Sequence, residues 1–252
     1  MCGIIGYIGK REAKDLLLEG LKRLEYRGYD SAGMAIVENK NSNIKNKRSA
    51  KIQVVKALGK VANLEEKLEK VSVVGNVGIA HTRWATHGKP SEKNAHPHLD
   101  TSRGIALVHN GIIENYALLK MNIEKKGIVF RSDTDSEVIV HLLQAAIKSG
   151  NSFEEAFRLT LGKLKGTYGI AVVNQAEPER LLVARMGSPL VIGVGKDEWF
   201  VASDVSPLLP HTRRVVYLED GEYAVLTPDG YTVHARGKIS KKEVVDVEWS
   251  ET

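Results

Sequence analysis

Cysteine is nearly absent from this sequence: among its 252 residues the only one is Cys2. A single cysteine excludes an intrachain disulfide and fits a reducing compartment. No apolar run approaches the roughly 18 residues that a membrane helix needs. Residues 1–11 also lack the basic and apolar regions of a signal peptide. The sequence therefore predicts a cytoplasmic globular protein with no membrane association.

The formal net charge of +5 raises the question of a nucleic-acid partner. Much of the excess lies in residues 40–60 and 238–242, and neither stretch is interleaved with aromatic residues. No zinc-finger, homeodomain or RNA-recognition pattern accompanies them. Solvated basic loops explain the charge more simply, so no nucleic-acid partner is expected.

The hydrophobic pattern predicts strands at both ends of the chain and helices between them. A strand over residues 4–8 precedes an amphipathic helix with Leu17, Leu21 and Leu24 on one face. Further helices are expected at residues 54–71, 115–126, 134–149 and 153–165. Further strands are expected at residues 32–37, 78–82, 104–109, 168–173, 181–185, 190–194, 199–202, 215–218, 223–226 and 231–234. This order predicts an α+β fold with two sheets between helical layers.

Three smaller expectations concern the segments around these elements. Thr134 and Glu137 match a capping box, which predicts the start of a helix. Residues 39–48 read as a polar loop, and residues 238–252 as a charged tail with few core residues.

The position of Cys2 allows two interpretations. Most free cysteines are small buried hydrophobic residues. If Met1 is removed, however, Cys2 carries both a thiol and a free α-amine. An α-amine titrates near 7.7–8.0 and can act as a base at neutral pH, where it would take the thiol proton in place of the usual histidine. Position alone does not decide between the two.

Two polar segments follow, each with a structural and a functional interpretation. Residues 27–33, Arg-Gly-Tyr-Asp-Ser-Ala-Gly, form an ordinary Gly-rich turn if taken alone. Residues 81–98 hold four histidines, but their spacing matches no zinc pattern, and no metal site is expected. The arginine, tryptophan and threonine of this segment suit the binding of a small carboxylate instead.

Asn110-Gly111 and Asp135 complete the set of candidate functional residues. Asn110-Gly111 is either an Asn-Gly turn that ends a strand or a pair of N–H donors for a tetrahedral oxyanion. Asp135 either favours a helix N-terminus or pairs with a substrate ammonium. A thiol with its own base, oxyanion donors and paired charges together describe hydrolysis of the side-chain amide of an α-amino acid. Glutamine has these groups.

Five blocks of the sequence resemble the glutaminase domain of the glutamine–fructose-6-phosphate aminotransferases, or glucosamine-6-phosphate synthases. They are Cys2-Gly3-Ile4-Ile5-Gly6 and residues 27–33, 81–88 with 94–98, 108–115 and 134–137. Similarity extends to about Leu226. The tyrosine in Arg27-Gly28-Tyr29-Asp30 and the 81–88 block favour this family. Phosphoribosylpyrophosphate amidotransferases, asparagine synthetases and glutamate synthases share looser versions of the motifs.

The resemblance implies a four-layer αββα fold of the N-terminal-nucleophile hydrolases, with two antiparallel sheets between helices. It implies that Cys2 is nucleophile and base, forming a cysteinyl thioester, and that Asn110 and Gly111 stabilise the oxyanion. It assigns the α-carboxylate of glutamine to Arg83 and the α-ammonium to Asp135. No cofactor is implied.

The resemblance also assigns residues around the pocket. Thr86 and His87 would line it, and Trp84 would lie on a loop that covers bound glutamine. Arg27 and Gly28 would support the free terminus. One residue departs from the family pattern, because Ser136 stands where threonine is more usual.

The family's C-terminal sugar-isomerase half has no counterpart in these 252 residues. We therefore expect a glutaminase domain at residues 1–240 and a tail, or the start of a linker, at residues 241–252. The expected partners are L-glutamine and the isomerase domain, and the resemblance is compatible with a homodimeric full-length protein. Two alternatives stay open: the glutaminase domain of another N-terminal-nucleophile amidotransferase, and a catalytically silent module on the same scaffold.

Overall fold

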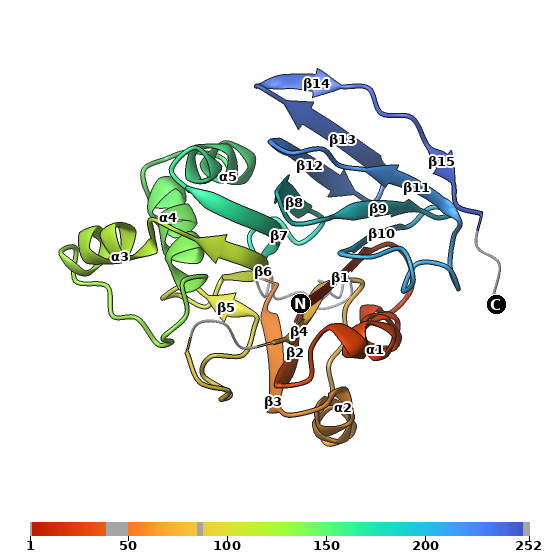
Figure 1. Ribbon diagram of the computed structural model, residues 1–252, viewed down its shortest axis with the longest axis horizontal. Coiled ribbons are helices and arrows are strands. Elements are labelled where there is room, and N and C mark those ends of the chain that lie inside the picture. The colour runs from red at the N-terminus through yellow and green to blue at the C-terminus, as the bar shows by residue number, and fades with distance from the viewer. Residues whose placement is uncertain (1, 39–49, 85–87, 249–252) are drawn as a thin grey trace, which may run out of the picture.

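The structure is a computed structural model that describes residues 2–38, 50–84 and 88–248. It contains two β-sheets packed face to face, with helices on both outer faces (Figure 1). Every pairing between the named strands is antiparallel. The predicted α+β fold with two antiparallel sheets between helical layers is confirmed.

One sheet has eight strands in the order β15-β11-β9-β10-β1-β4-β2-β3. Their bounds are β1 Gly3–Ile8, β2 Ser31–Val37, β3 Ile52–Leu58, β4 Val77–Arg83, β9 Val191–Val194, β10 Trp199–Ala202, β11 Arg214–Tyr217 and β15 Val245–Asp246. Its outer face is covered by α1 (Ala13–Leu24) and α2 (Val61–Glu69), and a 3-10 turn, η1 (Glu25–Arg27), follows α1.

The other sheet has seven strands in the order β14-β13-β12-β8-β7-β6-β5. Their bounds are β5 His98–Leu99, β6 Ile105–Ile113, β7 Gly166–Asn174, β8 Leu181–Met186, β12 Glu222–Thr227, β13 Gly230–Ala235 and β14 Lys238–Ser240. Its outer face is covered by α3 (Tyr116–Glu124), α4 (Glu137–Lys148) and α5 (Phe153–Leu161), which lie together on the left of Figure 1.

Three apolar clusters fill the three interfaces between the four layers, and β1 shows how the sequence produces them. Ile4 and Ile8 belong to the cluster between the sheets, whereas Ile5 and Tyr7 belong to the cluster under α1 and α2. Successive strand residues point to opposite faces, so a strand that is apolar throughout can only be stable when both of its faces are covered. The central position of β1 fixes the place of Cys2, which directly precedes it.

The helix predicted over residues 54–71 is wrong in its first part. Residues 52–58 form β3, which pairs with β2 along its whole length. Gly59 follows with a φ of +86° and separates this strand from α2. Only Val61, Leu64 and Leu68 form the buried face of a helix, as the spacing predicted. The β-branched residues before Gly59 gain more by pairing with β2 than by extending the helix.

Helix boundaries and the capping box also differ from the prediction. The helix expected from residue 134 begins at Glu137, and the one expected to reach residue 165 ends at Leu161. Glu137 accepts hydrogen bonds from the backbone N–H of Ser132 (2.7 Å) and of Arg131 (2.9 Å). The Thr134 hydroxyl instead lies 3.0 Å from the Ser132 hydroxyl and 3.0 Å from His98 Nε2. The box that Thr134 was expected to form with Glu137 is therefore replaced by a loop-closing contact of Ser132.

The predicted polar loop at residues 39–48 lies outside the described residues. Part of the segment predicted as a charged tail adds a short strand to each sheet, β14 and β15.

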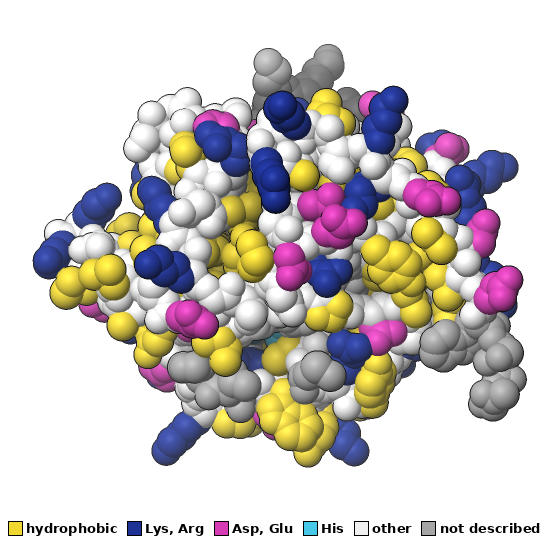
Figure 2. Space-filling model, turned by 45° about the horizontal axis from the view of Figure 1, so that its top comes forward, with side chains coloured by type: hydrophobic (Ala, Val, Ile, Leu, Met, Phe, Trp, Pro, Cys, Tyr) yellow, Lys and Arg dark blue, Asp and Glu magenta, His cyan; other side chains and the backbone are white. Residues whose placement is uncertain are grey.

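Among the described residues, no helix is both long and apolar enough to cross a bilayer. On the face seen in Figure 2, basic side chains are dispersed among acidic and apolar ones and do not gather in one patch.

Candidate active site

Cys2 lies at the N-terminal end of β1, against the backbone of Trp84. The Trp84 N–H donates to the Cys2 Sγ at 3.2 Å, and the Trp84 carbonyl oxygen lies 3.5 Å from the same sulfur. Burial raises the pKa of the Cys2 thiol above its ordinary value, although the Trp84 hydrogen bond and the charge of Arg83 lower it. A thiol of this kind is protonated at neutral pH, so it needs a base before it can attack.

Asn110, on β6, reaches Cys2 with its side-chain amide. Its Nδ2 donates to the Cys2 carbonyl oxygen at 3.0 Å. Its Oδ1 faces the Nε2 of His81 at 3.0 Å, and this Nε2 also lies 3.2 Å from the His109 carbonyl oxygen. A carbonyl can only accept, so Nε2 carries the proton, and the Asn110 atom that faces it is the amide oxygen. The amide N–H₂ must then point toward Cys2.

His81 stays neutral in this arrangement. Burial lowers its pKa to about 3, despite the opposing hydrogen bond with Asn110. The neutral ring has one N–H, and the two acceptors at Nε2 hold it there. His81 thereby fixes the orientation of the Asn110 amide, a role that inspection of the sequence did not identify.

Gly111 follows Asn110 in a conformation that other residues rarely adopt. Its φ is +124°, and a Cβ at this position would lie 2.2 Å from the Thr167 carbonyl oxygen. The strand does not end in an Asn-Gly turn, because β6 continues to Ile113 and pairs with β7 throughout. The turn interpretation of Asn110-Gly111 is therefore wrong.

Arg83 and Asp135 supply the two charges of the site. Arg83 ends β4, and its side chain is buried, with Nη2 donating to the Gly88 carbonyl oxygen at 3.1 Å. Burial lowers the pKa of Arg83 below its ordinary value, although the nearby Cys2, Asp30 and Asp135 act in the opposite direction. The Oδ2 of Asp135 accepts from the backbone N–H of Ile113 at 2.7 Å, which ties this carboxylate to β6.

Cys2, Arg83, Gly111 and Asp135 line one cavity at the N-terminal end of β1, whereas Asn110 contacts Cys2 without lining the cavity. Its lining residues are Cys2, Arg83, Trp84, His96, His109, Gly111, Thr134, Asp135 and Ser136. The sequence singled out five of them, Cys2, Arg83, Trp84, Gly111 and Asp135, and the structure brings these together. Thr86 and His87, also expected at the pocket, lie outside the described residues.

Arg27 and Gly28 lie behind this cavity and do not line it. Arg27 forms an ion pair with Asp204, and its Nε donates to the Tyr26 hydroxyl at 3.0 Å. A Cβ on Gly28 would lie within 2.9 Å of the Trp84 nitrogen. The absence of a side chain on Gly28 lets this turn pack directly on the backbone that holds the Cys2 thiol.

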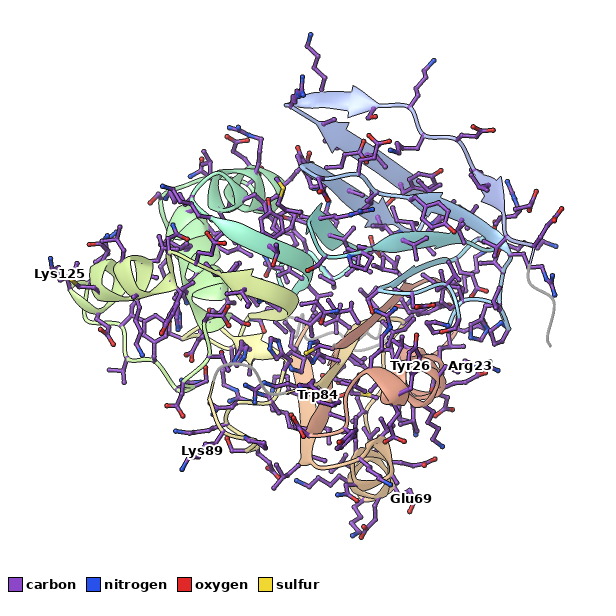
Figure 3. All side chains as sticks on the ribbon, in the orientation of Figure 1. Arg23, Tyr26, Glu69, Trp84, Lys89 and Lys125 are labelled. Carbon is purple, nitrogen blue, oxygen red and sulfur yellow. The ribbon has the colours of Figure 1, made fainter. Side chains whose placement is uncertain are left out.

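Trp84, labelled in Figure 3, is 45% exposed. Its ring packs edge-on against Tyr29, with 5.5 Å between ring centroids. Trp84 therefore combines a backbone that contacts Cys2 with a side chain on the surface above the cavity. An exposed aromatic ring at this position suits the cover over the substrate that the resemblance assigns to it.

The buried histidines form a packed network. His109 Nδ1 lies 2.8 Å from the Ser136 hydroxyl, and its Nε2 faces the Thr167 carbonyl oxygen at 3.3 Å. His81 stacks on His96 at 4.2 Å, and His96 meets His98 edge-on at 4.4 Å. In the part of the chain that the structure describes, no three His, Cys, Asp or Glu residues are grouped as metal ligands would be.

The model of the glutamine amidotransferase domain matches residues 81–210, about half of the chain. The chain belongs to the glutamine amidotransferase family. The matched range includes Arg83, Asn110, Gly111 and Asp135.

Three curated relatives each match 99% of the chain. Glutamine–fructose-6-phosphate aminotransferase (isomerising) of Chlorobaculum tepidum is 53% identical over 256 residues. The enzymes of the same name from Pyrococcus horikoshii and Thermococcus kodakarensis are 49% and 50% identical over 252 residues. The chain spans about 40% of the length of these relatives.

Solved structures agree with the fold. Glutamine phosphoribosylpyrophosphate amidotransferase from B. subtilis is 27% identical, with a TM-score of 0.76, and the match covers 93% of this chain and 49% of that one. A structure described as the allosteric regulatory enzyme of purine biosynthesis is 28% identical, with a TM-score of 0.77 and the same coverage of both chains. These likenesses confirm the predicted amidotransferase fold with two antiparallel sheets.

Proposed function

We propose that this chain hydrolyses L-glutamine to L-glutamate and ammonia, with Cys2 as the nucleophile. The observation that carries the proposal is that Cys2, Arg83 and Asp135 line one cavity, while the Asn110 amide donates to the Cys2 carbonyl oxygen. Each of these groups has a separate task in amide hydrolysis of an amino acid.

Removal of Met1 supplies the base in this proposal. The free α-amine of Cys2 takes the thiol proton, and Sγ attacks the side-chain amide carbon of glutamine. The amide Nδ2–H of Asn110 and the backbone N–H of Gly111 stabilise the oxyanion of the tetrahedral intermediate. The intermediate collapses when the ammonium at Cys2 returns a proton to the leaving nitrogen, which gives ammonia and a thioester. Water then hydrolyses the thioester to glutamate and restores the thiol.

The charged groups of the cavity account for the choice of substrate. The guanidinium of Arg83 is proposed to bind the α-carboxylate of glutamine, and Asp135 its α-ammonium. Thr86, His87 and Trp84 complete the pocket in the manner that the family resemblance implies. A nucleophilic thiol must stay reduced, which supports a cytoplasmic location for this chemistry.

The ammonia is proposed to serve the conversion of fructose 6-phosphate to glucosamine 6-phosphate. The three relatives of this name described above are 49–53% identical to the chain, and the phosphoribosylpyrophosphate amidotransferase is 27% identical. In this proposal residues 1–240 are the glutaminase domain, and residues 241–252 lead toward a sugar-isomerase domain in a homodimeric protein. Assay of the natural full-length protein with fructose 6-phosphate distinguishes it from amidotransferases with other acceptors.

The test of glutamine hydrolysis uses Cys2→Ala. We expect the variant to lose glutaminase activity while keeping the melting temperature of the parent. Intact-mass measurement should find Met1 absent from active protein, since a peptide bond at the Cys2 nitrogen removes the base. Full activity in Cys2→Ala, or in protein that retains Met1, would contradict the mechanism. A processed protein that does not hydrolyse glutamine at all would point to the silent module.

A further inference from the structure

A second and larger cavity shares none of its described lining residues with the glutamine pocket and lies where the edge strands of the two sheets approach each other. β3 is the last strand of one sheet and β5 the last strand of the other (Figure 1). The cavity between them measures about 660 Å³. Ligand pockets for small molecules have volumes of about 300–1,000 Å³. The glutamine hydrolysis proposed above makes no use of this space.

The cavity is strongly basic. Six cationic side chains line it, together with only two carboxylates, Glu92 and Glu137. The cations are Lys56, Lys67, Lys70, Lys93, Arg103 and Arg131.

Three of the lysines already have acidic partners. Lys67 pairs with Glu92, Lys70 with Glu66, and Lys93 with Asp133. Within residues 2–38, 50–84 and 88–248, no ion pair is formed by Lys56, Arg103 or Arg131.

The second carboxylate of the cavity is also committed. Glu137 accepts from the backbone of Arg131 and Ser132 and lies 3.1 Å from His141 Nε2. It is therefore held by its own helix and by the loop before it. Its carboxylate stays ionised, so Lys56, Arg103 and Arg131 face one negative charge and leave an excess of positive charge for an anion from solution.

Lys56 shows that these charges are close together. It is partly buried, and its Nζ donates to the Ala95 carbonyl oxygen at 2.6 Å. Burial lowers the pKa of Lys56 to about 8; the carboxylate of Glu137 opposes this lowering, and the positive charge of Arg103 adds to it. Two neighbouring cations in a partly desolvated cavity destabilise each other, and a bound anion would remove this repulsion.

The walls of the cavity are not entirely polar. Val54, Val55, Val71 and Leu99 also line it. The space and its apolar walls exceed what a bare anion fills. They suit a ligand with an anionic group and a larger body.

We propose that the cavity between β3 and β5 binds a small molecule that carries a phosphate group. Arg103 and Arg131 would hold the phosphate oxygens from the rim, because the guanidinium fork matches this geometry. Lys56 would contribute a point charge from the floor. The apolar side chains would contact the sugar or base to which the phosphate is attached.

Isothermal titration calorimetry tests the proposal, with inorganic phosphate, glucose 6-phosphate and ADP as separate ligands at constant ionic strength. The variants are Arg103→Asn and Lys56→Gln. Asparagine tolerates the φ of +59° at Arg103, so the first variant removes the charge without added backbone strain. The matched control is Arg158→Gln, which removes one positive charge from the exposed face of α5. Melting temperatures establish that each variant is folded.

We expect saturable binding by the parent protein and about tenfold weaker binding by each cavity variant. Arg158→Gln should bind like the parent. Tighter binding of glucose 6-phosphate or ADP than of phosphate identifies the attached body, and equal binding of all three would contradict the contacts proposed for the apolar walls. The proposal is wrong if no ligand gives saturable heat up to about 10 mM, or if folded Arg103→Asn binds as well as the parent. Glutamine turnover does not enter this measurement.

Discussion

Two polar residues of the glutamine cavity differ in when their interactions form. Asn110 is aimed at Cys2 by His81, whereas Asp135 is tied to the backbone of Ile113. An oxyanion exists only near the transition state, but the α-ammonium of glutamine is present from the first encounter. Asn110 should therefore affect the rate of the chemical step, and Asp135 the binding of substrate.

Replacing Asn110 and Asp135 by alanine separates these roles. Asn110→Ala should lower kcat by about 10²–10³ with a modest change in KM, because one oxyanion donor is lost. Asp135→Ala should raise KM. Steady-state kinetics of glutamine hydrolysis on both purified variants checks the expectation, with melting temperatures as the control for folding. If both substitutions changed the same parameter to the same extent, this division of roles would be wrong.

Arg83 is expected to recognise the α-carboxylate. Its guanidinium can form two charge-assisted hydrogen bonds in a fixed geometry, which lysine cannot reproduce. Loss of a desolvated charge pair of this kind costs about 2–5 kcal/mol. Arg83→Lys should therefore raise KM for glutamine markedly.

The control for Arg83→Lys is a second substrate, a glutamine analogue whose α-carboxylate is an uncharged amide. The substitution should have much less effect on this analogue, because there is no carboxylate to bind. Kinetics of the parent and the variant with both substrates gives the comparison. Equal losses with the two substrates would indicate that Arg83 only shapes its loop, where it already bonds to the Gly88 carbonyl oxygen.

At the scale of elements, β6 depends on a glycine at position 111. The strand continues through this residue at a φ of +124°, with the Thr167 carbonyl oxygen in the space of the missing Cβ. Gly127 also has a positive φ, +79°, but nothing lies within 4 Å of its missing Cβ. A side chain at Gly127 would therefore cause backbone strain alone, whereas a side chain at Gly111 would also collide with β7.

Alanine at the two glycines should have unequal effects on stability. Gly127→Ala should lower the free energy of unfolding by about 1–2 kcal/mol, the cost of a side chain in the left-handed region. Gly111→Ala should lower it further, because the Cβ forces β6 and β7 apart, and it should also impair glutamine hydrolysis. Urea denaturation of both variants measures the difference. Similar losses at both positions would mean that β7 adjusts to the new side chain without cost.

Elements whose apolar periodicity matched their burial were predictable from the sequence. In α1 the expected face of Leu17, Leu21 and Leu24 is fully buried. The error at residues 54–71 has a physical origin: β3 is an edge strand with partly exposed residues, so its pattern does not alternate cleanly. Pairing with β2 decides its conformation, and pairing between distant segments is not visible in a local window.

At the scale of the whole molecule, the charged and nucleophilic residues of the site were predictable, but the groups that orient them were not. Cys2, Arg83 and Asp135 are unusual residue types in their places and attract notice in a sequence. His81, His96 and His109 act only through contacts made when β4, β6 and the segment before β5 come together. Histidines inside otherwise apolar strands were the available signal.

This histidine network predicts how the stability of the whole fold depends on pH. Burial lowers the pKa of His81 to about 3 and lowers those of His96, His98 and His109 below the ordinary value. Each ring then takes up a proton near pH 6.5 in the unfolded chain but not in the folded one. Because the unfolded state binds more protons, the free energy of unfolding falls as the pH drops below 6.5.

Urea denaturation at pH 7.5 and 5.5 should therefore give unequal free energies of unfolding. Each neutral histidine contributes a loss of up to about 1.4 kcal/mol per pH unit below pH 6.5, so four together give a loss of several kcal/mol. Glu137, whose pKa is lowered to about 2, loses its stabilising contribution only below about pH 4.5 and does not add to this window. His81→Gln should reduce the pH-dependent part by about a quarter, whatever it does to stability at pH 7.5. A free energy of unfolding that stays constant from pH 7.5 to 5.5 would mean that these rings gain protons without unfolding.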